Sequence, residues 1–177
     1  MARIAPVKLE NADQATADTL RAVDKKIGMI PNLFATFAQS PTVLNAYLGL
    51  SEELSKGRLN ASQREIVALA VGQANACQYC LSAHTLMGKG AGLSDEAIAR
   101  ARTGAADGEL DNAIAALAVK IVRQRGVLSD DDMKSAHDAG VDDGLVMEII
   151  ANVALNTLTN YTNHIAGTDI DFPVVSL

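Results

Sequence analysis

The sequence predicts an all-α fold, and three observations support this expectation. Apolar residues recur at three- and four-residue spacing along most of the chain. The segments between these periodic stretches contain the Gly, Pro, Ser and Asp residues that are typical of helix starts and stops. Aromatic residues make up only 3% of the chain and Trp is absent, so the core must consist of Ala, Leu, Ile and Val, which suits closely packed helices. No segment shows the alternation expected of a strand.

Residues that favour helix ends delimit the helices expected before the cysteines. Gly28 ends the first helix, and Pro31 and Pro41 fit the first turns of the next two. The segment Ser62 to Glu65 has the pattern of a capping box, with Ser62 as the N-cap, and this alone explains a glutamate at Glu65. The expected ranges are 11–27, 32–39, 42–56 and 62–73.

The second half is also expected to be helical, followed by an extended tail through Pro173. A helix that starts near Asn75 or Ala76 contains both cysteines, and a cluster of glycines ends it near Lys89. The last helix is apolar around much of its circumference, so the domain or another subunit must cover it. Further helices are expected at 94–104, 110–125, 129–140 and 142–165. No linker divides the chain, so residues 1–177 are expected to form a single domain of about eight helices.

Composition and charge exclude several classes of protein. The net charge is −6 and the Lys and Arg residues are scattered, which argues against nucleic acid or an anionic membrane as a partner. No apolar stretch approaches the ~18 residues of a membrane span, and the N-terminus lacks the pattern of a signal peptide. A cytoplasmic location is therefore expected. Paired cysteines there are more often redox-catalytic or metal-binding than structural.

The chain has only two cysteines, and they lie three residues apart in Cys77-Gln78-Tyr79-Cys80, with His84 four residues later. Residues at i and i+3 of a helix have Cα atoms within the ~4.4–6.8 Å that a disulfide accepts. Cys77 and Cys80 are therefore expected to interconvert between dithiol and disulfide with little movement. His84 follows Cys80 by one turn, on the same face of the helix.

A reactive thiol must ionise, and this sequence offers a base for the purpose. A thiol with a pKa of ~8.5 is only about 3% ionised at pH 7, and a helix N-terminus shifts that pKa by less than about one unit. His84 is placed to act as the base. If the chain reverses near Asn75, Glu65 and His84 lie at about the same height on adjacent helices. Glu65 would then orient the imidazole and stabilise its protonated form.

Each of these residues also has a simpler interpretation. Glu65 would serve only in the capping box, His84 would be an ordinary histidine, and the cysteines would be small buried apolar residues. A zinc site is another alternative, but Cys-x2-Cys-x3-His supplies three ligands where a structural site usually has four. A thioredoxin-type module is disfavoured because no βαβ pattern is present. Tyr79 either hydrogen-bonds near the cysteines or packs. The polar cluster 160–164 either lines a pocket or serves as a helix cap or an interface, and the second interpretation is favoured.

A family resemblance rests on four motifs. The spacing Glu65-x11-Cys77-x2-Cys80-x3-His84 resembles the alkyl-hydroperoxidase D-like (AhpD-like) branch of the carboxymuconolactone decarboxylase family. The resemblance covers roughly residues 25–173, and the Glu/Cys/Cys/His spacing is its specific part. The other three motifs are Ile30-Pro31-Asn32-Leu33-Phe34, Gly88-Lys89-Gly90-Ala91-Gly92-Leu93-Ser94 and Asn160-Tyr161-Thr162-Asn163-His164.

The resemblance implies an all-helical, oligomeric protein, often a trimer or a dimer assembled into hexamers, that reduces hydroperoxides. By analogy Cys80 attacks the peroxide and becomes a sulfenic acid, and Cys77 condenses with it to form a disulfide. Glu65 and His84 relay the proton, and an external dithiol, lipoamide-linked in some relatives, resets the pair. Close relatives of the peroxidase have a histidine where this chain has Tyr79. No flavin, haem or nucleotide motif is visible, so no cofactor is expected.

The leading hypothesis is therefore an antioxidant thiol peroxidase. One alternative is a carboxymuconolactone decarboxylase-like enzyme that acts without the dithiol and uses Arg64 to bind an anionic substrate. Another alternative is a non-enzymatic redox sensor, in which the same disulfide changes an oligomer interface. An enzyme would cycle with a reductant, whereas a sensor would be oxidised once and persist in that state.

Overall fold

The computed structural model describes residues 2–177 and confirms the all-α fold. These residues contain nine α-helices, one short 3₁₀-helix and no strand. The elements are η1 (Leu9–Asn11), α1 (Gln14–Ile27), α2 (Asn32–Phe37), α3 (Pro41–Leu54), α4 (Ala61–Ala74), α5 (Gln78–Gly90), α6 (Asp95–Arg102), α7 (Glu109–Gln124), α8 (Asp130–Asp138) and α9 (Asp143–Ala166). None of the helices in this part of the chain combines the length and the apolar character needed to span a bilayer.

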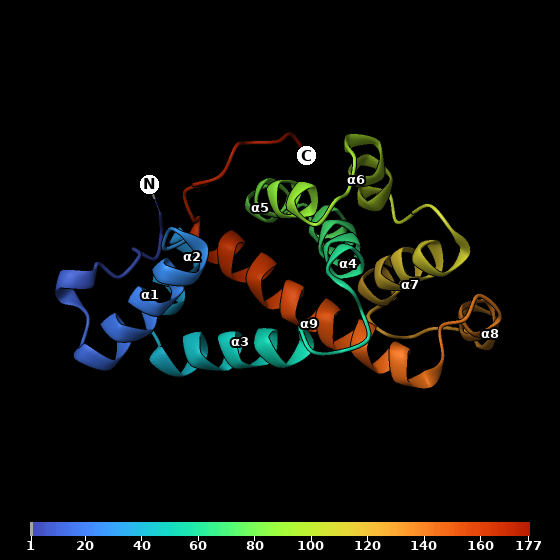
Figure 1. Cartoon of the computed structure of the whole chain (residues 1–177), viewed down its shortest axis with the longest axis horizontal. Coiled ribbons are helices and arrows are strands. Elements are labelled where there is room, and N and C mark those ends of the chain that lie inside the picture. The colour runs from blue at the N-terminus through green and yellow to red at the C-terminus, as the bar shows by residue number, and fades with distance from the viewer. Residues whose placement is uncertain (1) are drawn as a thin grey trace.

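The arrangement is built around α4 and α9 (Figure 1). α4 contacts α5, α6, α7 and α9, and α3 lies along α9. The 24-residue α9 runs diagonally through the molecule, and its C-terminal half passes close to the start of α5. The tail after α9 returns across α5, where Val175 bonds to Gln78 and Ser82. The start of α5 is therefore enclosed by a helix and by the tail.

Three apolar clusters hold this framework together, and two of them bear on the position of the site. The larger one joins α4, α7 and α9 and includes Val67, Ile114 and Ile149, all with 4% exposure or less. The second cluster surrounds the cysteines with side chains from α1, α2 and α3, among them Leu20, Phe37 and Leu44. Burial of each such side chain contributes about 1.5–3 kcal/mol. The cysteines therefore lie in a packed core rather than on a mobile loop.

The start of α4 differs from the sequence prediction. The N-cap is Asn60, whose side chain accepts from the Gln63 amide at 2.9 Å, while the Gln63 side chain accepts from the Asn60 amide at 3.0 Å. The capping box predicted for Ser62 and Glu65 is therefore wrong. Asn caps a helix as well as Ser does, and Gln at N3 completes the box, so the helix begins two residues earlier. This start releases Glu65 from capping.

The turn between α4 and α5 also differs from the prediction. Asn75 is the C-cap of α4, not the N-cap of the next helix, and Cys77 is the N-cap of α5. Between them Ala76 has a φ of 52°, in the left-handed region that a residue with a side chain rarely adopts. This backbone reverses the chain in three residues and sets α4 and α5 side by side as a hairpin. The reversal near Asn75 that the sequence predicts is confirmed.

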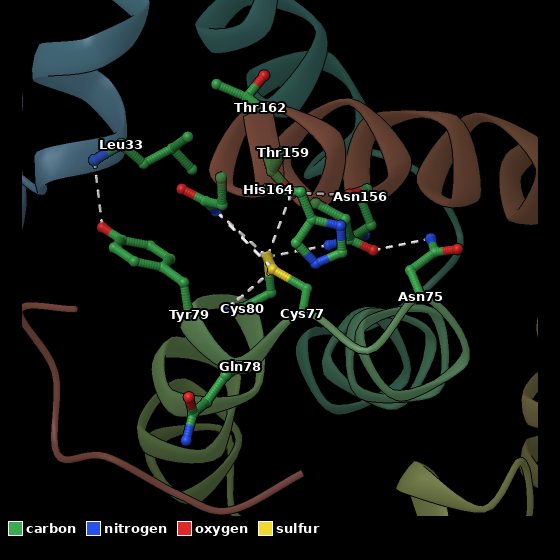
Figure 2. The surroundings of a disulfide bond; sticks show 12 residues. Leu33, Asn75, Cys77, Gln78, Tyr79, Cys80, Asn156, Thr159, Thr162 and His164 are labelled. Carbon is green, nitrogen blue, oxygen red and sulfur yellow. Dashed lines mark hydrogen bonds between the residues drawn. A yellow bond between two sulfur atoms is a disulfide. The ribbon is translucent and has the colours of Figure 1, made fainter. Parts of the chain in front are cut away.

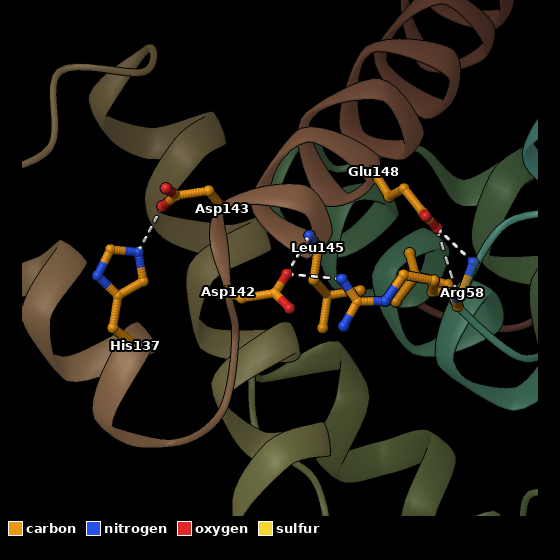
Figure 3. A network of polar contacts seen from close by, with 7 residues as sticks. Arg58, His137, Asp142, Asp143, Leu145 and Glu148 are labelled. Carbon is orange, nitrogen blue, oxygen red and sulfur yellow. Dashed lines mark hydrogen bonds and ion pairs between the residues drawn. The ribbon is translucent and has the colours of Figure 1, made fainter.

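A polar network ties the entry of α4 to the start of α9 (Figure 3). The Arg58 side chain bonds to Asp142 at 2.6 Å, and the Arg58 backbone amide bonds to Glu148 at 2.7 Å. Asp142 is also the N-cap of α9, where its side chain accepts from the Leu145 amide. The hydrogen bond from Arg58, followed by that from Leu145, lowers the pKa of Asp142 to about 2. The network fixes how α4 and α9 meet, and both helices carry site residues.

Candidate redox active site

Cys77 and Cys80 form a disulfide at the start of α5, with Cα atoms 5.3 Å apart. This distance lies in the range predicted from the i, i+3 spacing. Both residues are buried, with exposures of 0% for Cys77 and 3% for Cys80. As the N-cap of α5, Cys77 accepts a bond from the Cys80 amide at 3.3 Å to its sulfur. The pair is therefore held rigidly at the positive end of a helix.

Amide donors from α9 point at the sulfurs (Figure 2). The Nδ2 atom of Asn160 lies 2.9 Å from Cys80 Sγ, and Nδ2 of Asn163 lies 3.4 Å from the same atom. Oδ1 of Asn160 accepts from Nδ2 of Asn75 at 2.9 Å, which fixes the orientation of the Asn160 side-chain amide. Thr159 places its hydroxyl 4.0 Å from Cys80 Sγ. Two N–H donors and a helix N-terminus favour a negative charge on Cys80.

The favoured interpretation of the 160–164 cluster, a cap or an interface, is wrong for Asn160 and Asn163, which are 0% and 5% exposed. Asn163 instead lines a cavity, as the alternative interpretation expects. The sequence does contain a signal for this role, because polar residues recur at three- and four-residue spacing within an apolar helix. This spacing predicts a buried polar stripe that needs partners. The residues of the stripe are Asn152, Asn156, Thr159, Asn160 and Asn163.

Glu65 and His84 meet across the α4–α5 hairpin, as expected from their similar distances along the chain from the turn at Asn75. Nδ1 of His84 lies 2.8 Å from Oε2 of Glu65, and the two side chains are only 18% and 12% exposed. A carboxylate accepts only, so Nδ1 carries the hydrogen of this bond. In the neutral ring Nε2 then has a free lone pair and is the basic nitrogen.

His84 and Cys80 line the same pocket but are not hydrogen-bonded to each other. No hydrogen bond joins His84 to either sulfur within residues 2–177, whereas both His84 and Cys80 line a cavity of about 230 Å³. Most of the remaining wall is apolar. It is formed by Ile27, Met29, Pro31, Leu33, Phe34, Tyr47, Tyr79, Ala83, Leu86, Met87, Thr159 and Phe172. The fold therefore brings a sulfur and an imidazole to one cavity that suits an apolar molecule.

Tyr79 packs instead of bonding to the cysteines. Its hydroxyl accepts from the Leu33 amide at 3.2 Å, and its ring meets the edge of Phe172 with centroids 5.6 Å apart. Burial raises the pKa of Tyr79, so its phenol stays protonated. The ring of Tyr79 therefore packs, and its hydroxyl bonds to the backbone of α2.

Sequence analysis missed Tyr47 of α3, which lies beside the Glu65–His84 pair. It lines the disulfide pocket and also a second cavity of about 220 Å³ that Glu65 and Arg64 border. Burial, and secondly the charge of Glu65, raises the pKa of Tyr47 to about 12. Its ring packs on Phe34 and Phe37. One tyrosine at helical spacing gives no signal of such a position, because only the tertiary fold brings α3 to α4.

The structure also shows the surroundings of Arg64 and of the residues considered as zinc ligands. The Arg64 side chain donates to the Leu59 carbonyl and borders the second cavity, which His84 also lines. Within residues 2–177, no three Cys, His, Asp or Glu side chains gather in an arrangement that would hold a metal ion. The Cys77, Cys80 and His84 set of the zinc alternative is therefore not assembled as a metal site.

Known proteins resemble this chain in sequence and in fold. Residues 41–124 match the model of the carboxymuconolactone decarboxylase family. The alkyl hydroperoxide reductase Rv2159c of Mycobacterium tuberculosis is 32% identical over 97 residues, which cover 54% of this chain and 28% of that protein. The chain thus spans little more than a quarter of the length of this curated relative.

Solved structures confirm the fold at low sequence identity. A peroxidase-related protein from Ralstonia eutropha JMP134, described as an alkylhydroperoxidase AhpD core, has a TM-score of 0.86 and 22% identity over 96% of this chain and 92% of that one. A peroxidase-related protein from Silicibacter sp. TM1040 has a TM-score of 0.80 and 20% identity over 94% and 92%. The debrominase Bmp8 has a TM-score of 0.80 and 18% identity over 96% and 92%.

Proposed function

We propose that this chain, which matches the carboxymuconolactone decarboxylase family over residues 41–124 and has the fold of an AhpD core, is an AhpD-like thiol peroxidase that reduces hydroperoxides through a Cys77/Cys80 dithiol–disulfide cycle. The observation that carries the proposal is a pocket that holds Cys80 and His84 together, with Glu65 bonded to the imidazole. The resemblance to an alkyl hydroperoxide reductase supports it.

Cys80 is proposed as the cysteine that attacks the peroxide. It lines the shared pocket, and the donors from Asn160 and Asn163 favour its thiolate. Nε2 of His84 takes the thiol proton, and Glu65 stabilises the imidazolium that forms. The thiolate attacks one peroxide oxygen, the O–O bond breaks, and the alkoxide leaves as an alcohol with the proton from His84. Cys80 becomes a sulfenic acid.

Cys77 is proposed to resolve this sulfenic acid. Its sulfur attacks Cys80 Sγ, the S–O bond breaks, and the hydroxyl leaves as water with the Cys77 proton. The product is the disulfide seen in the structure, formed over the short Cα separation of the pair. One hydroperoxide and two thiols give one alcohol, one water and one disulfide. An external dithiol then reduces the disulfide and is itself oxidised.

The experiment that tests the proposal measures peroxide consumption with dithiothreitol as reductant. Cys80→Ser is expected to abolish turnover, and Cys77→Ser is expected to stop after one event with a trapped sulfenic acid. The control is Ser82→Ala in the same helix, a small polar residue that bonds to the Gln78 carbonyl and to the Val175 amide and is expected to retain turnover. Full turnover in Cys80→Ser would overturn the proposal. Lactone decarboxylation that survives in the Cys77→Ala/Cys80→Ala variant would favour the decarboxylase alternative.

The pocket also predicts a substrate preference. Its wall is mostly apolar, so an organic hydroperoxide gains burial that hydrogen peroxide cannot gain, at about 0.8 kcal/mol per buried CH₂. We expect kcat/KM for cumene hydroperoxide to exceed that for hydrogen peroxide at least 10-fold. In Leu33→Ala, which enlarges the pocket, this ratio should fall. Equal values for the two peroxides in the unmodified protein would contradict the assignment of the pocket as the substrate site.

A further inference from the structure

The two cysteines of the disulfide line two different cavities. Cys80 lines the apolar pocket with His84, whereas Cys77 lines another cavity of about 280 Å³. This cavity, distinct from both cavities described above, is called the Cys77 pocket. Its other lining residues are Ala76, Gln78, Tyr79, Asn163, His164, Thr168, Ile170 and Leu177. Tyr79 lines both cavities.

His164 offers a base at the Cys77 pocket. Its Nε2 lies 3.2 Å from the carbonyl oxygen of Ala76, and a carbonyl oxygen only accepts. Nε2 therefore carries the hydrogen, and in the neutral ring Nδ1 has the free lone pair. The ring is exposed at the end of α9, next to the turn that carries Cys77. Each of the two cavities is thus lined by one cysteine and one histidine, Cys80 with His84 and Cys77 with His164.

The surroundings of the two sulfurs determine which one is the better leaving group. Thiol–disulfide exchange proceeds faster when the departing sulfur is the more stable thiolate. Cys80 Sγ has two side-chain amide donors, at 2.9 and 3.4 Å. Cys77 Sγ has one close donor, the backbone amide of Cys80 at 3.3 Å, and its nearest side-chain donor, from Asn163, is 4.0 Å away. Cys80 is therefore the sulfur that leaves, and Cys77 is the sulfur that an incoming thiolate attacks.

We propose that a small dithiol reductant enters through the Cys77 pocket, where His164 deprotonates it for attack on Cys77, so that peroxide and reductant use opposite sides of the disulfide. This inference rests on the proposed function, because it assigns the reductive half of the same cycle. The reductant thiolate bonds to Cys77 Sγ, the Cys77–Cys80 bond breaks, and Cys80 leaves as a thiolate. The second thiol of the reductant then attacks the reductant sulfur that is bonded to Cys77. This bond breaks, Cys77 leaves with the proton of that thiol, and the reductant is released as a cyclic disulfide.

The site of attack is tested with the oxidised protein and the monothiol glutathione, in the absence of peroxide. After brief reaction and alkylation of free thiols, peptide mass spectrometry is expected to find glutathione on Cys77 and the alkyl group on Cys80. The opposite labelling, or equal labelling of the two cysteines, would overturn the assignment. Because no peroxide is present, this result is independent of whether the protein is a peroxidase.

The role of His164 is tested by the rate of disulfide reduction by dithiothreitol in His164→Gln. Glutamine keeps an N–H donor for the Ala76 carbonyl but has no basic nitrogen, so the turn is retained and the base is lost. We expect about a 10-fold lower rate at pH 7, where such thiols are only a few per cent ionised, and convergence with the unmodified rate as the pH rises. The matched control is His137→Gln on α8, which should be unchanged.

The rate of peroxide oxidation separates this proposal from the proposed function. His164→Gln should keep the oxidation rate of the reduced protein, since His164 does not line the Cys80 pocket. A reduction rate within 2-fold of the unmodified protein across the pH range would overturn the role of His164. Equal losses in oxidation and reduction would also overturn it, because they would indicate a structural defect.

Discussion

Glu65 lies in the second turn of α4, and its carboxylate is 2.8 Å from Nδ1 of His84. Gln63, two residues earlier, supplies the capping interaction and also bonds to Asp111 at 2.7 Å. The two polar side chains therefore divide two tasks that the sequence alone assigns to one residue. Gln63 stabilises the helix start, and Glu65 is free to act on the imidazole.

Glu65→Gln and Gln63→Ala should therefore have opposite consequences. Glu65→Gln removes the charge that stabilises the His84 imidazolium, so we expect the peroxide oxidation rate to fall at least 10-fold. The free energy of unfolding should change by less than ~1 kcal/mol. Gln63→Ala should cost about 1 kcal/mol in urea unfolding and keep the rate. Loss of stability with full activity in Glu65→Gln would show that Glu65 is only structural.

At the scale of helices, the sequence predicts which segments are helical better than it predicts where they start. The longer helical segments are predicted correctly because their apolar residues keep helical spacing over several turns. The starts of α4 and α5 are misplaced by one to three residues because Asn60 competes with Ser62, and Cys77 with Asn75, as the N-cap. The Glu65–His84 contact is predictable because it depends only on a hairpin. The Asn160–Cys80 contact is not, because it joins residues 80 apart through tertiary packing.

The Arg58–Asp142 pair that joins the α4 entry to α9 predicts a response to acid. The pKa of Asp142 is lowered in the folded protein to about 2 from an ordinary value of 3.8. Its contribution to stability is therefore present above about pH 4 and is lost as the pH falls towards 2. We expect the urea midpoint to fall less between pH 5 and pH 2 in Asp142→Asn, since Asn keeps the N-cap but does not titrate.

The control for this acid response is Asp24→Asn on α1, because Asp24 makes no ion pair within the described residues. This variant should lose stability in acid as the unmodified protein does. An Asp142→Asn midpoint that falls as steeply as that of the unmodified protein would show that another group carries the acid response.

For the whole molecule, the outer face of α9 predicts self-association. Large apolar side chains on this face are 41–65% exposed and recur at three- and four-residue multiples. They are Met147, Ile150, Leu158, Tyr161 and Ile165. Val43 and Leu50 of the adjacent α3 are also exposed. Exposed apolar side chains in such a row are typical of an interface, and we propose that a second copy of the chain covers them.

Light scattering tests this proposal with Ile150→Glu/Leu158→Glu. Both side chains are exposed, so the fold should persist while a charge on each side of the interface lowers the molar mass of the assembly. The matched control is Val127→Glu, which is 78% exposed and lies in the connection between α7 and α8. The control should keep the mass of the unmodified protein. A single-chain mass for the unmodified protein would contradict the proposal.

The most direct measurement of the redox cycle is the intact mass and thiol count of the reduced protein before and after one equivalent of cumene hydroperoxide. We expect the two thiols to disappear together, with a mass loss equal to two hydrogens and one cumyl alcohol formed per chain. Two thiols that persist in the presence of peroxide, or oxygen added to the protein without a disulfide, would contradict the assignment of Cys77 and Cys80 as a peroxide-reducing pair.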